Sequence, residues 1–160
     1  MFKLTDFQKG YLLGIMDGEG CISITKHKLS YLPNGFCFRP EVVITSTKIS
    51  VLQYINQFAG GRVWLLKPRN RGKNECAAHQ LRFNRKELIN GGLLDLFIDG
   101  LVLKSKQAEI LKQYFVLSDL RRHHPNDSKM RKQIHLKKEN LCRQIHKLNA
   151  RGFFVGSSPP

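Results

Sequence analysis

A chain of 160 residues is long enough to bury one hydrophobic core but too short for two enzymatic domains of ordinary size. Its 27 lysines and arginines outnumber 12 acidic residues, and the formal charge of +15 favours a polyanionic partner, usually nucleic acid. Most of the excess falls in residues 62–86 and 121–160. A solvated, lysine-rich face is the alternative interpretation of these two blocks.

The cysteines predict neither a zinc ribbon nor a disulfide framework, because they lie far apart and no CxxC pair occurs. We expect reduced thiols at Cys21, Cys37, Cys76 and Cys142. The sequence has no charged leader followed by an apolar segment and no uncharged apolar run of about 18 residues. A soluble, intracellular protein without a membrane partner is therefore expected.

The first predicted element is a helix that begins near Asp6, since Thr5 and Gln8 have the spacing of a capping box. Its two sides are both apolar, which predicts a buried helix packed on two sides. One face contains Phe7, Tyr11, Gly14, Ile15 and Gly18, and the other contains Leu12, Leu13 and Met16.

Two strands are predicted next, because the apolar pattern changes to a period of two after Gly20. Residues 22–27 and 36–44 alternate on either side of a loop at 33–35, which indicates an antiparallel hairpin. Thr47 is the predicted cap of a second helix with Val51, Ile55 and Phe58 on one face, ended by Gly60 and Gly61. Strands around 62–67 and 76–84 follow.

Helices are predicted over 86–97, over 101–117 and from 126–128 onward, the last with Met130, Ile134, Leu141, Ile145 and Leu148 on one side. The predicted fold class is α+β in the order αββαββα, with a curved antiparallel sheet and additional C-terminal helices. We expect a core of residues 1–120, a basic helical extension at 121–151 and a flexible tail at 152–160.

The segment Leu13-Gly14-Ile15-Met16-Asp17-Gly18-Glu19-Gly20 closely resembles the motif of the LAGLIDADG homing endonucleases. It has the hydrophobic helix, the two small residues and the terminal acidic pair of that motif, followed at once by a strand. The predicted element order agrees as well, so the resemblance covers most of the chain. The alternative interpretation of Asp17 and Glu19 is a polar turn after a buried helix.

The resemblance implies particular roles for site residues. Glu19 would be the catalytic metal ligand, the Gly18 carbonyl would assist, and Asp17 would stabilise the helix ends. Leu103-Lys104-Ser105-Lys106-Gln107-Ala108 is similar to the segment that carries a catalytic lysine in the family, here Lys104, although an exposed lysine at a helix start is the alternative. A water-ordering position, commonly Gln, falls at Ser46 or Thr47.

The spacing of two glycines in the first helix predicts a dimer. Gly14 and Gly18 are four residues apart, so a second helix can approach the backbone closely. The predicted dimer interface consists of Tyr11, Gly14, Ile15 and Gly18, and a symmetric pair would bring two Glu19 carboxylates together. Residues 96–101 resemble the motif faintly, but Leu101 replaces its acidic residue and about 60 residues follow, so the chain does not contain a second unit.

The polar face of the predicted sheet is the expected DNA-reading surface, since the major groove admits a β-ribbon. The loop residues Arg69, Arg71 and Lys73 and the basic C-terminal helix suit phosphate contacts, with simple solubility as the alternative. Trp64 fits either the core or a base contact. The predicted reading face contains Ser23, Thr25, His27, Arg39, Glu41, Arg62, Trp64, Gln80 and Arg82.

Together these features predict a homodimeric, site-specific endonuclease that hydrolyses double-stranded DNA within a long pseudo-palindromic site. The resemblance implies Mg²⁺ or another divalent cation such as Mn²⁺, and an intron-encoded enzyme of an organelle (chloroplast or mitochondrion) or of a bacterial, archaeal or phage cytoplasm. The alternative is a non-cleaving nucleic-acid binder on the same fold, either an RNA maturase or a DNA-binding regulator.

Overall fold

The computed structural model describes residues 2–30, 35–66, 77–123 and 127–150. The chain divides into two compact units. The first unit consists of Met1–Ile22 and Glu41–Glu109, and the second unit consists of Ser23–Pro40 and Ile110–Pro160. In the described part of the chain, no helix is both long and apolar enough to cross a bilayer.

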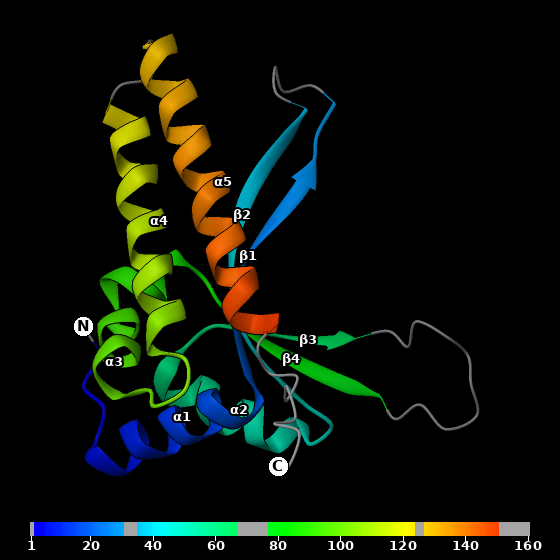
Figure 1. Ribbon diagram of the computed structural model, residues 1–160. Coiled ribbons are helices and arrows are strands. Elements are labelled where there is room, and N and C mark those ends of the chain that lie inside the picture. The colour runs from blue at the N-terminus through cyan, green and yellow to red at the C-terminus, as the bar shows by residue number, and fades with distance from the viewer. Residues whose placement is uncertain (1, 31–34, 67–76, 124–126, 151–160) are drawn as a thin grey trace, which may run out of the picture. The chain divides into compact units, whose positions relative to one another are not determined.

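The element order confirms the predicted αββαββα succession and the additional C-terminal helices (Figure 1). The strands form one four-stranded sheet in the order β1-β2-β4-β3. The elements are α1 (Asp6–Glu19), β1 (Gly20–Lys28), β2 (Phe36–Ser46), α2 (Ile49–Ala59), β3 (Arg62–Leu66), β4 (Ala78–Phe83), a π-helical turn (Lys86–Asn90), α3 (Leu93–Gly100), α4 (Ser105–His123) and α5 (Ser128–Ala150).

Helix α1 begins at the predicted residue. The capping box is complete, because the Gln8 amide donates to Thr5 Oγ1 at 3.2 Å and the Thr5 amide donates to Gln8 Oε1 at 3.0 Å. Leu12 and Met16 are fully buried, whereas Gly14 is exposed. Within one chain, α1 therefore packs on one side only.

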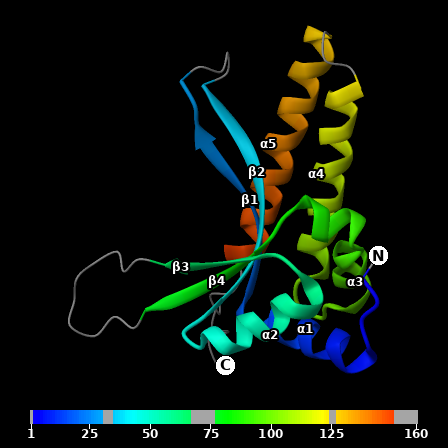
Figure 2. The same cartoon turned by 180° about the vertical axis from the view of Figure 1, so that it is seen from behind.

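In the first unit, β4 pairs antiparallel with both β2 and β3. Helix α2 packs against β3 and β4 (Figure 2), and it buries Leu52, Ile55 and Ala59. The predicted face was wrong at its flanks, because Val51 and Phe58 are only partly buried. The predicted end at Gly60 and Gly61 is confirmed: their φ angles of 70° and 100° lie in the left-handed region that glycine adopts readily.

Three predicted helix boundaries were wrong. Thr47 does not cap α2, since Lys48 is the N-cap and makes no side-chain capping bond. The single helix predicted over 86–97 is two segments, because Gly92 at φ 80° interrupts it between the π-helical turn and α3. The helix predicted over 101–117 begins four residues later, at Ser105, and continues to His123.

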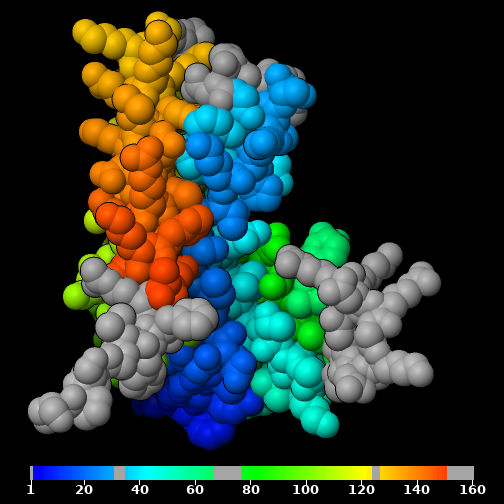
Figure 3. Space-filling model, turned by 45° about the vertical axis from the view of Figure 1, so that its right-hand side comes forward, coloured from blue at the N-terminus to red at the C-terminus, as the bar shows by residue number. Residues whose placement is uncertain are grey.

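In the second unit, α4 and α5 run side by side (Figure 1), and α5 lies alongside the strands β1 and β2 (Figure 3). The predicted apolar side of α5 is confirmed at its centre, where Ile134, Leu141 and Ile145 are buried. Buried polar groups join the helices to the hairpin. The Tyr114 hydroxyl donates to the Phe38 carbonyl at 2.6 Å, and the Cys142 thiol donates to the Ile24 carbonyl at 3.0 Å.

Candidate active site

The end of α1 is joined to the segment before α4 by the Asp17 side chain. One carboxylate oxygen of Asp17 accepts a hydrogen bond from the Val102 amide at 2.8 Å, and the other accepts one from the Leu103 amide at 3.1 Å. These amides precede the first turn of α4 and have no helical partner. Asp17 thus holds residues 102–104 beside the end of α1, more than 80 residues away in the sequence.

Lys104 is placed at the same point. Its ammonium donates to the Met16 carbonyl at 3.0 Å and to the Asp17 carbonyl. A cation is favoured here because the carbonyls at a helix C-terminus carry a partial negative charge. Burial lowers the pKa of Lys104, while the charges of Asp17, Cys21 and Glu19 act in the opposite direction. The predicted catalytic lysine and the acidic motif therefore belong to one site.

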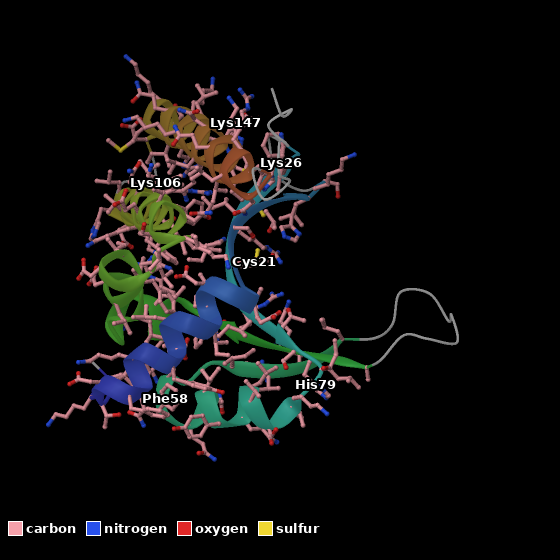
Figure 4. All side chains as sticks on the ribbon, turned by 60° about the horizontal axis from the view of Figure 1, so that its bottom comes forward. Cys21, Lys26, Phe58, His79, Lys106 and Lys147 are labelled. Atoms are coloured by element: carbon pink, nitrogen blue, oxygen red, sulfur yellow. The ribbon has the colours of Figure 1, made fainter. Side chains whose placement is uncertain are left out.

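Glu19 is the last residue of α1, and its side chain is exposed. Its carboxylate forms no hydrogen bond to the residues that the structure describes, whereas the Asp17 carboxylate is occupied by two amides. The turn into β1 requires glycine at position 20, since a Cβ there would lie 2.5 Å from the Met16 carbonyl oxygen. Cys21, the next residue, lies just beyond the end of α1 (Figure 4).

A metal ion would find only part of a site in one chain. Within the described ranges, no three His, Cys, Asp or Glu side chains gather as a metal-binding group. The exposed Glu19 carboxylate supplies a hard oxygen donor of the kind that Mg²⁺ prefers. The oxygen donors of one chain therefore fit part of the coordination shell of a magnesium ion.

Ser46, the predicted water-ordering residue, lies at the end of β2, and its hydroxyl accepts a hydrogen bond from the Lys48 amide at 3.1 Å. Its neighbour Thr47 is exposed. No hydrogen bond joins either residue to Glu19 or Lys104 among the described residues. A role for Ser46 or Thr47 at the site stays a prediction.

The outer face of α1 is open around its glycines, although the Tyr11 ring at its edge packs against the Tyr54 ring of α2 at 5.5 Å. A Cβ added at Gly14 or Gly18 would meet no atom of the described residues within 4 Å. The predicted interface residues Tyr11 and Ile15 are partly exposed, and Phe7, one turn earlier on the same face, is 70% exposed. The intramolecular core uses the opposite face of the helix.

In the first unit, the predicted reading residues share the sheet face that alternates with the buried Leu81 and Phe83. The register places Trp64 opposite Gln80 and Arg62 opposite Arg82. Arg82 also lies 3.4 Å from Glu41, and Arg62 stacks over the Trp64 ring at 4.7 Å. Trp64 is 48% exposed, so the core interpretation of this residue was wrong. Thr45, opposite Gln80, belongs to this face and was missed, although the alternation of β2 could have indicated it.

The second unit holds four more of the predicted reading residues. The Thr25 hydroxyl lies 2.8 Å from His27 Nε2 and 3.3 Å from the Arg39 carbonyl oxygen. Arg39 is exposed, whereas Ser23 is only 9% exposed and has little surface to offer a ligand. The predicted phosphate contacts Arg69, Arg71 and Lys73 lie outside the described residues.

Comparison with known proteins agrees with this arrangement. The structure is similar to the homing endonuclease I-CvuI, with a TM-score of 0.67 and 18% identity over 96% of this chain and 86% of that chain. The archaeal intron-encoded homing endonuclease I-Vdi141I gives a TM-score of 0.67 and 20% identity over 95% and 90%. I-SmaMI gives a TM-score of 0.67 and 20% identity over 99% of this chain but 52% of that chain.

The similarity to these solved structures shows the fold of the chain. No curated protein sequence matches the chain significantly. The family model of the LAGLIDADG endonucleases matches residues 12–117, which is more than half of the chain and includes the acidic end of α1, the sheet and Lys104. The chain belongs to the LAGLIDADG endonuclease family.

Proposed function

We propose that this protein is a site-specific homing endonuclease that hydrolyses phosphodiester bonds of double-stranded DNA as a homodimer with a divalent cation. The observation that carries the proposal is that the exposed Glu19 carboxylate, which has no hydrogen bond to a described residue, and the ammonium of Lys104 both lie at the end of α1, a helix with open space in front of Gly14 and Gly18. Each part of this arrangement supports one part of the proposal.

The acidic residue and the lysine supply complementary chemistry. Glu19 carries a carboxylate oxygen toward solvent, and the neighbouring Gly18 carbonyl is a second oxygen donor of the same helix end. A bound Mg²⁺ or Mn²⁺ would lower the pKa of water and stabilise charge on a phosphate. Lys104 would stabilise negative charge that develops on the phosphate, from a position fixed by the Met16 and Asp17 carbonyls.

A homodimer is supported by the apolar surface around the open face of α1. Val102 is 84% exposed and Leu103 is 71% exposed, and the bonds to Asp17 hold both beside the end of α1. Exposed apolar groups next to open glycines indicate a surface covered by a partner. The chain also spans about half of I-SmaMI, the length expected of one half of a two-fold site.

The polar sheet face supports DNA as the substrate. Arginine can bind guanine with two hydrogen bonds, and glutamine suits adenine, so Arg62, Arg82 and Gln80 are able to read base edges. I-CvuI was solved in complex with target DNA, and I-SmaMI was solved bound to an uncleaved DNA target with calcium ions. By this likeness, the two sheets of a dimer would read the two halves of a pseudo-palindromic site.

The test is a cleavage selection. Purified protein is incubated with Mg²⁺ and a library of randomised DNA duplexes, and cleaved products are sequenced to define a site. The selected duplex is then cleaved with wild-type protein and with Glu19→Gln, which keeps the size of the side chain and removes its charge. We expect Glu19→Gln to cleave at least about a hundredfold more slowly than the wild type, which is the size of effect expected when one charge-stabilising contact is lost. The two proteins should bind the duplex with similar affinity.

Two outcomes would contradict the proposal. Wild-type protein that binds a selected duplex tightly and never nicks it with Mg²⁺ or Mn²⁺ would favour the non-cleaving binder. Equal cleavage by wild type and Glu19→Gln would place the chemistry elsewhere. Light scattering supplies the assembly test, since the proposed dimer has twice the 18.4 kDa mass of the chain.

A further inference from the structure

A cavity of about 280 Å³ lies in the second unit, between the start of β2 and the helices α4 and α5. Phe36 and Phe38 line it from the strand. Because side chains alternate along a strand, these two residues occupy the face opposite to Arg39, which belongs to the predicted reading surface. The two rings are therefore on the face opposite to Arg39, although Cys37 also lines the cavity and part of its lining comes from the basic C-terminal helix. Nothing in the proposed cleavage chemistry uses the cavity.

Aromatic rings form one wall of the cavity. The His135 ring lies 4.8 Å from the Phe36 ring and 5.3 Å from the Phe38 ring, measured between centroids. Tyr114 lines the same cavity and is fixed by its bond to the Phe38 carbonyl. Phe36 and His135 are partly exposed and offer ring surface to a planar group, whereas Phe38 and Tyr114 are buried behind them.

Cationic side chains form the other wall. Arg121, Arg131, Lys132 and Lys138 line the cavity, and an adjoining cavity of about 460 Å³ shares three of them and adds Arg122. Neither lining contains an aspartate or glutamate. A cavity that is lined by aromatic rings and several cations, but by no acidic group, suits an anionic ligand that also has an apolar part.

Two carboxylates of the helices α4 and α5 are paired with other side chains. Glu139 lies 3.3 Å from Lys26, which approaches α5 from β1 (Figure 4), and 3.3 Å from Arg143. Asp119 lies 3.8 Å from Arg122. Among the described residues, neither the Arg121 nor the Arg131 guanidinium forms an ion pair with a carboxylate.

His135 contributes a polar atom without a partner. Its Nε2 is buried and has no hydrogen bond within the described part of the chain. Burial lowers the pKa of His135, Glu139 raises it, and the cations Lys26, Arg121 and Lys138 lower it further. A neutral imidazole can either donate or accept at Nε2, depending on its tautomer. A buried nitrogen of this kind is costly unless something bonds to it.

We propose that this cavity binds a nucleoside phosphate, with the base against Phe36 and His135 and the phosphate between Arg121 and Arg131. Aromatic faces accept any base, and guanidinium groups bind phosphate oxygens in pairs, so the two walls match the two ends of a nucleotide. The cavity is at the small end of the range for ligand sites, which suits one nucleotide and not a longer segment. The nucleotide is either free or an unpaired nucleotide of a single strand.

Calorimetric titration of the full chain distinguishes this site from general attraction to a basic protein. Adenosine monophosphate is titrated into wild type, Arg131→Gln and Lys147→Gln at fixed ionic strength. Lys147 is a matched control, because it lies on the same helix (Figure 4) and lines neither cavity. We expect Arg131→Gln to weaken binding about tenfold, as loss of a charge-assisted hydrogen bond does, and Lys147→Gln to change it less than about twofold.

Three further titrants separate the components and the sources of the ligand. Adenosine and inorganic phosphate should each bind about tenfold more weakly than the nucleotide, because each engages only one wall. A short single strand that binds in an Arg131-dependent way while the free nucleotide does not would identify the ligand as an unpaired nucleotide. Absence of both kinds of binding, or equal losses in Arg131→Gln and Lys147→Gln, would overturn the proposal.

Discussion

The two compact units differ in where their polar and apolar groups find partners. In the first unit, the end of α1 exposes Glu19, and Gly14 and Gly18 of the same helix have open space in front of them in the described part of the chain. In the second unit, α4 and α5 bond to the hairpin through Tyr114 and Cys142. The site and the helix face of the first unit thus await other molecules, whereas the helices and the hairpin of the second unit are joined by bonds of their own.

This difference separates stability from chemistry. Groups that are bonded within the chain contribute to folding, and their loss is measured as a change in the free energy of unfolding. Exposed groups that form no bonds within the chain contribute little to folding, so their presence is better explained by a role in function. Substitutions in the two units should therefore affect different measurements, and the comparison fails if they do not.

The largest effect is expected for Lys104→Met. The change removes the charge beside Glu19 and keeps a similar apolar chain, so the single-turnover cleavage rate on a selected site should fall about a hundredfold. Lys106→Met is the control, because Lys106 is exposed two residues further along α4 (Figure 4) and makes no bond to α1 among the described residues. Equal losses in both variants would remove Lys104 from the site.

A second effect of the same site is on pH dependence. Burial lowers the pKa of Lys104, so its positive charge is lost at a lower alkaline pH than that of an ordinary lysine. The cleavage rate of the wild type should therefore fall as the pH rises through the lowered pKa of Lys104. Lys104→Met should not show this fall when its rate is measured over the same alkaline pH values.

The next effect concerns assembly. Gly14→Leu should raise the dimer dissociation constant by about ten- to a hundredfold, because a large side chain would separate two closely packed helices. The monomer should fold normally, since nothing lies within 4 Å of the new Cβ. Sedimentation measures the dissociation constant. Gln57→Leu adds the same side chain to the exposed side of α2 and should leave assembly unchanged.

A smaller effect, now on folding, is expected for Asp17→Ala. Two backbone amides lose their acceptor, so the free energy of unfolding should fall by about 1–2 kcal/mol. Asp99→Ala removes the same charge from an exposed position of α3 and should cost clearly less. Chemical denaturation compares the two variants. Equal costs would mean that Asp17 acts only through its charge.

The sequence predicted those elements whose boundaries are decided locally. Thr5 and Gln8 bond to each other, so their spacing alone placed the start of α1. The start of α4 was wrong because it depends on Asp17, a residue far away in the sequence that binds the amides of Val102 and Leu103. No spacing in the local pattern indicates such a contact.

The site shows the same division. The resemblance assigned Glu19 and Lys104 to one site, which periodicity could not do, and the structure places Lys104 against the last turn of α1. The carbonyls that hold Lys104 were not predicted, since main-chain acceptors carry no sequence signal. The cavity beside α5 was also missed, because its cations and its aromatic rings come from separate elements and look like a solvated face and a core in the sequence.

The smallest effect belongs to the second unit. Tyr114→Phe removes a buried hydrogen bond of 2.6 Å to the Phe38 carbonyl and should lower the free energy of unfolding by about 1 kcal/mol. Burial raises the pKa of Tyr114, so the folded state favours the neutral hydroxyl. Stability from this group is therefore complete below the ordinary tyrosine pKa and is lost as the pH rises through the raised value. Urea denaturation should show that alkaline loss in the wild type and a smaller one in Tyr114→Phe, while Tyr54→Phe, which alters a hydroxyl on the exposed side of α2, should behave like the wild type. Because this change lies in bonds that the chain makes with itself, cleavage at neutral pH should stay within about twofold of the wild-type rate while the protein is folded.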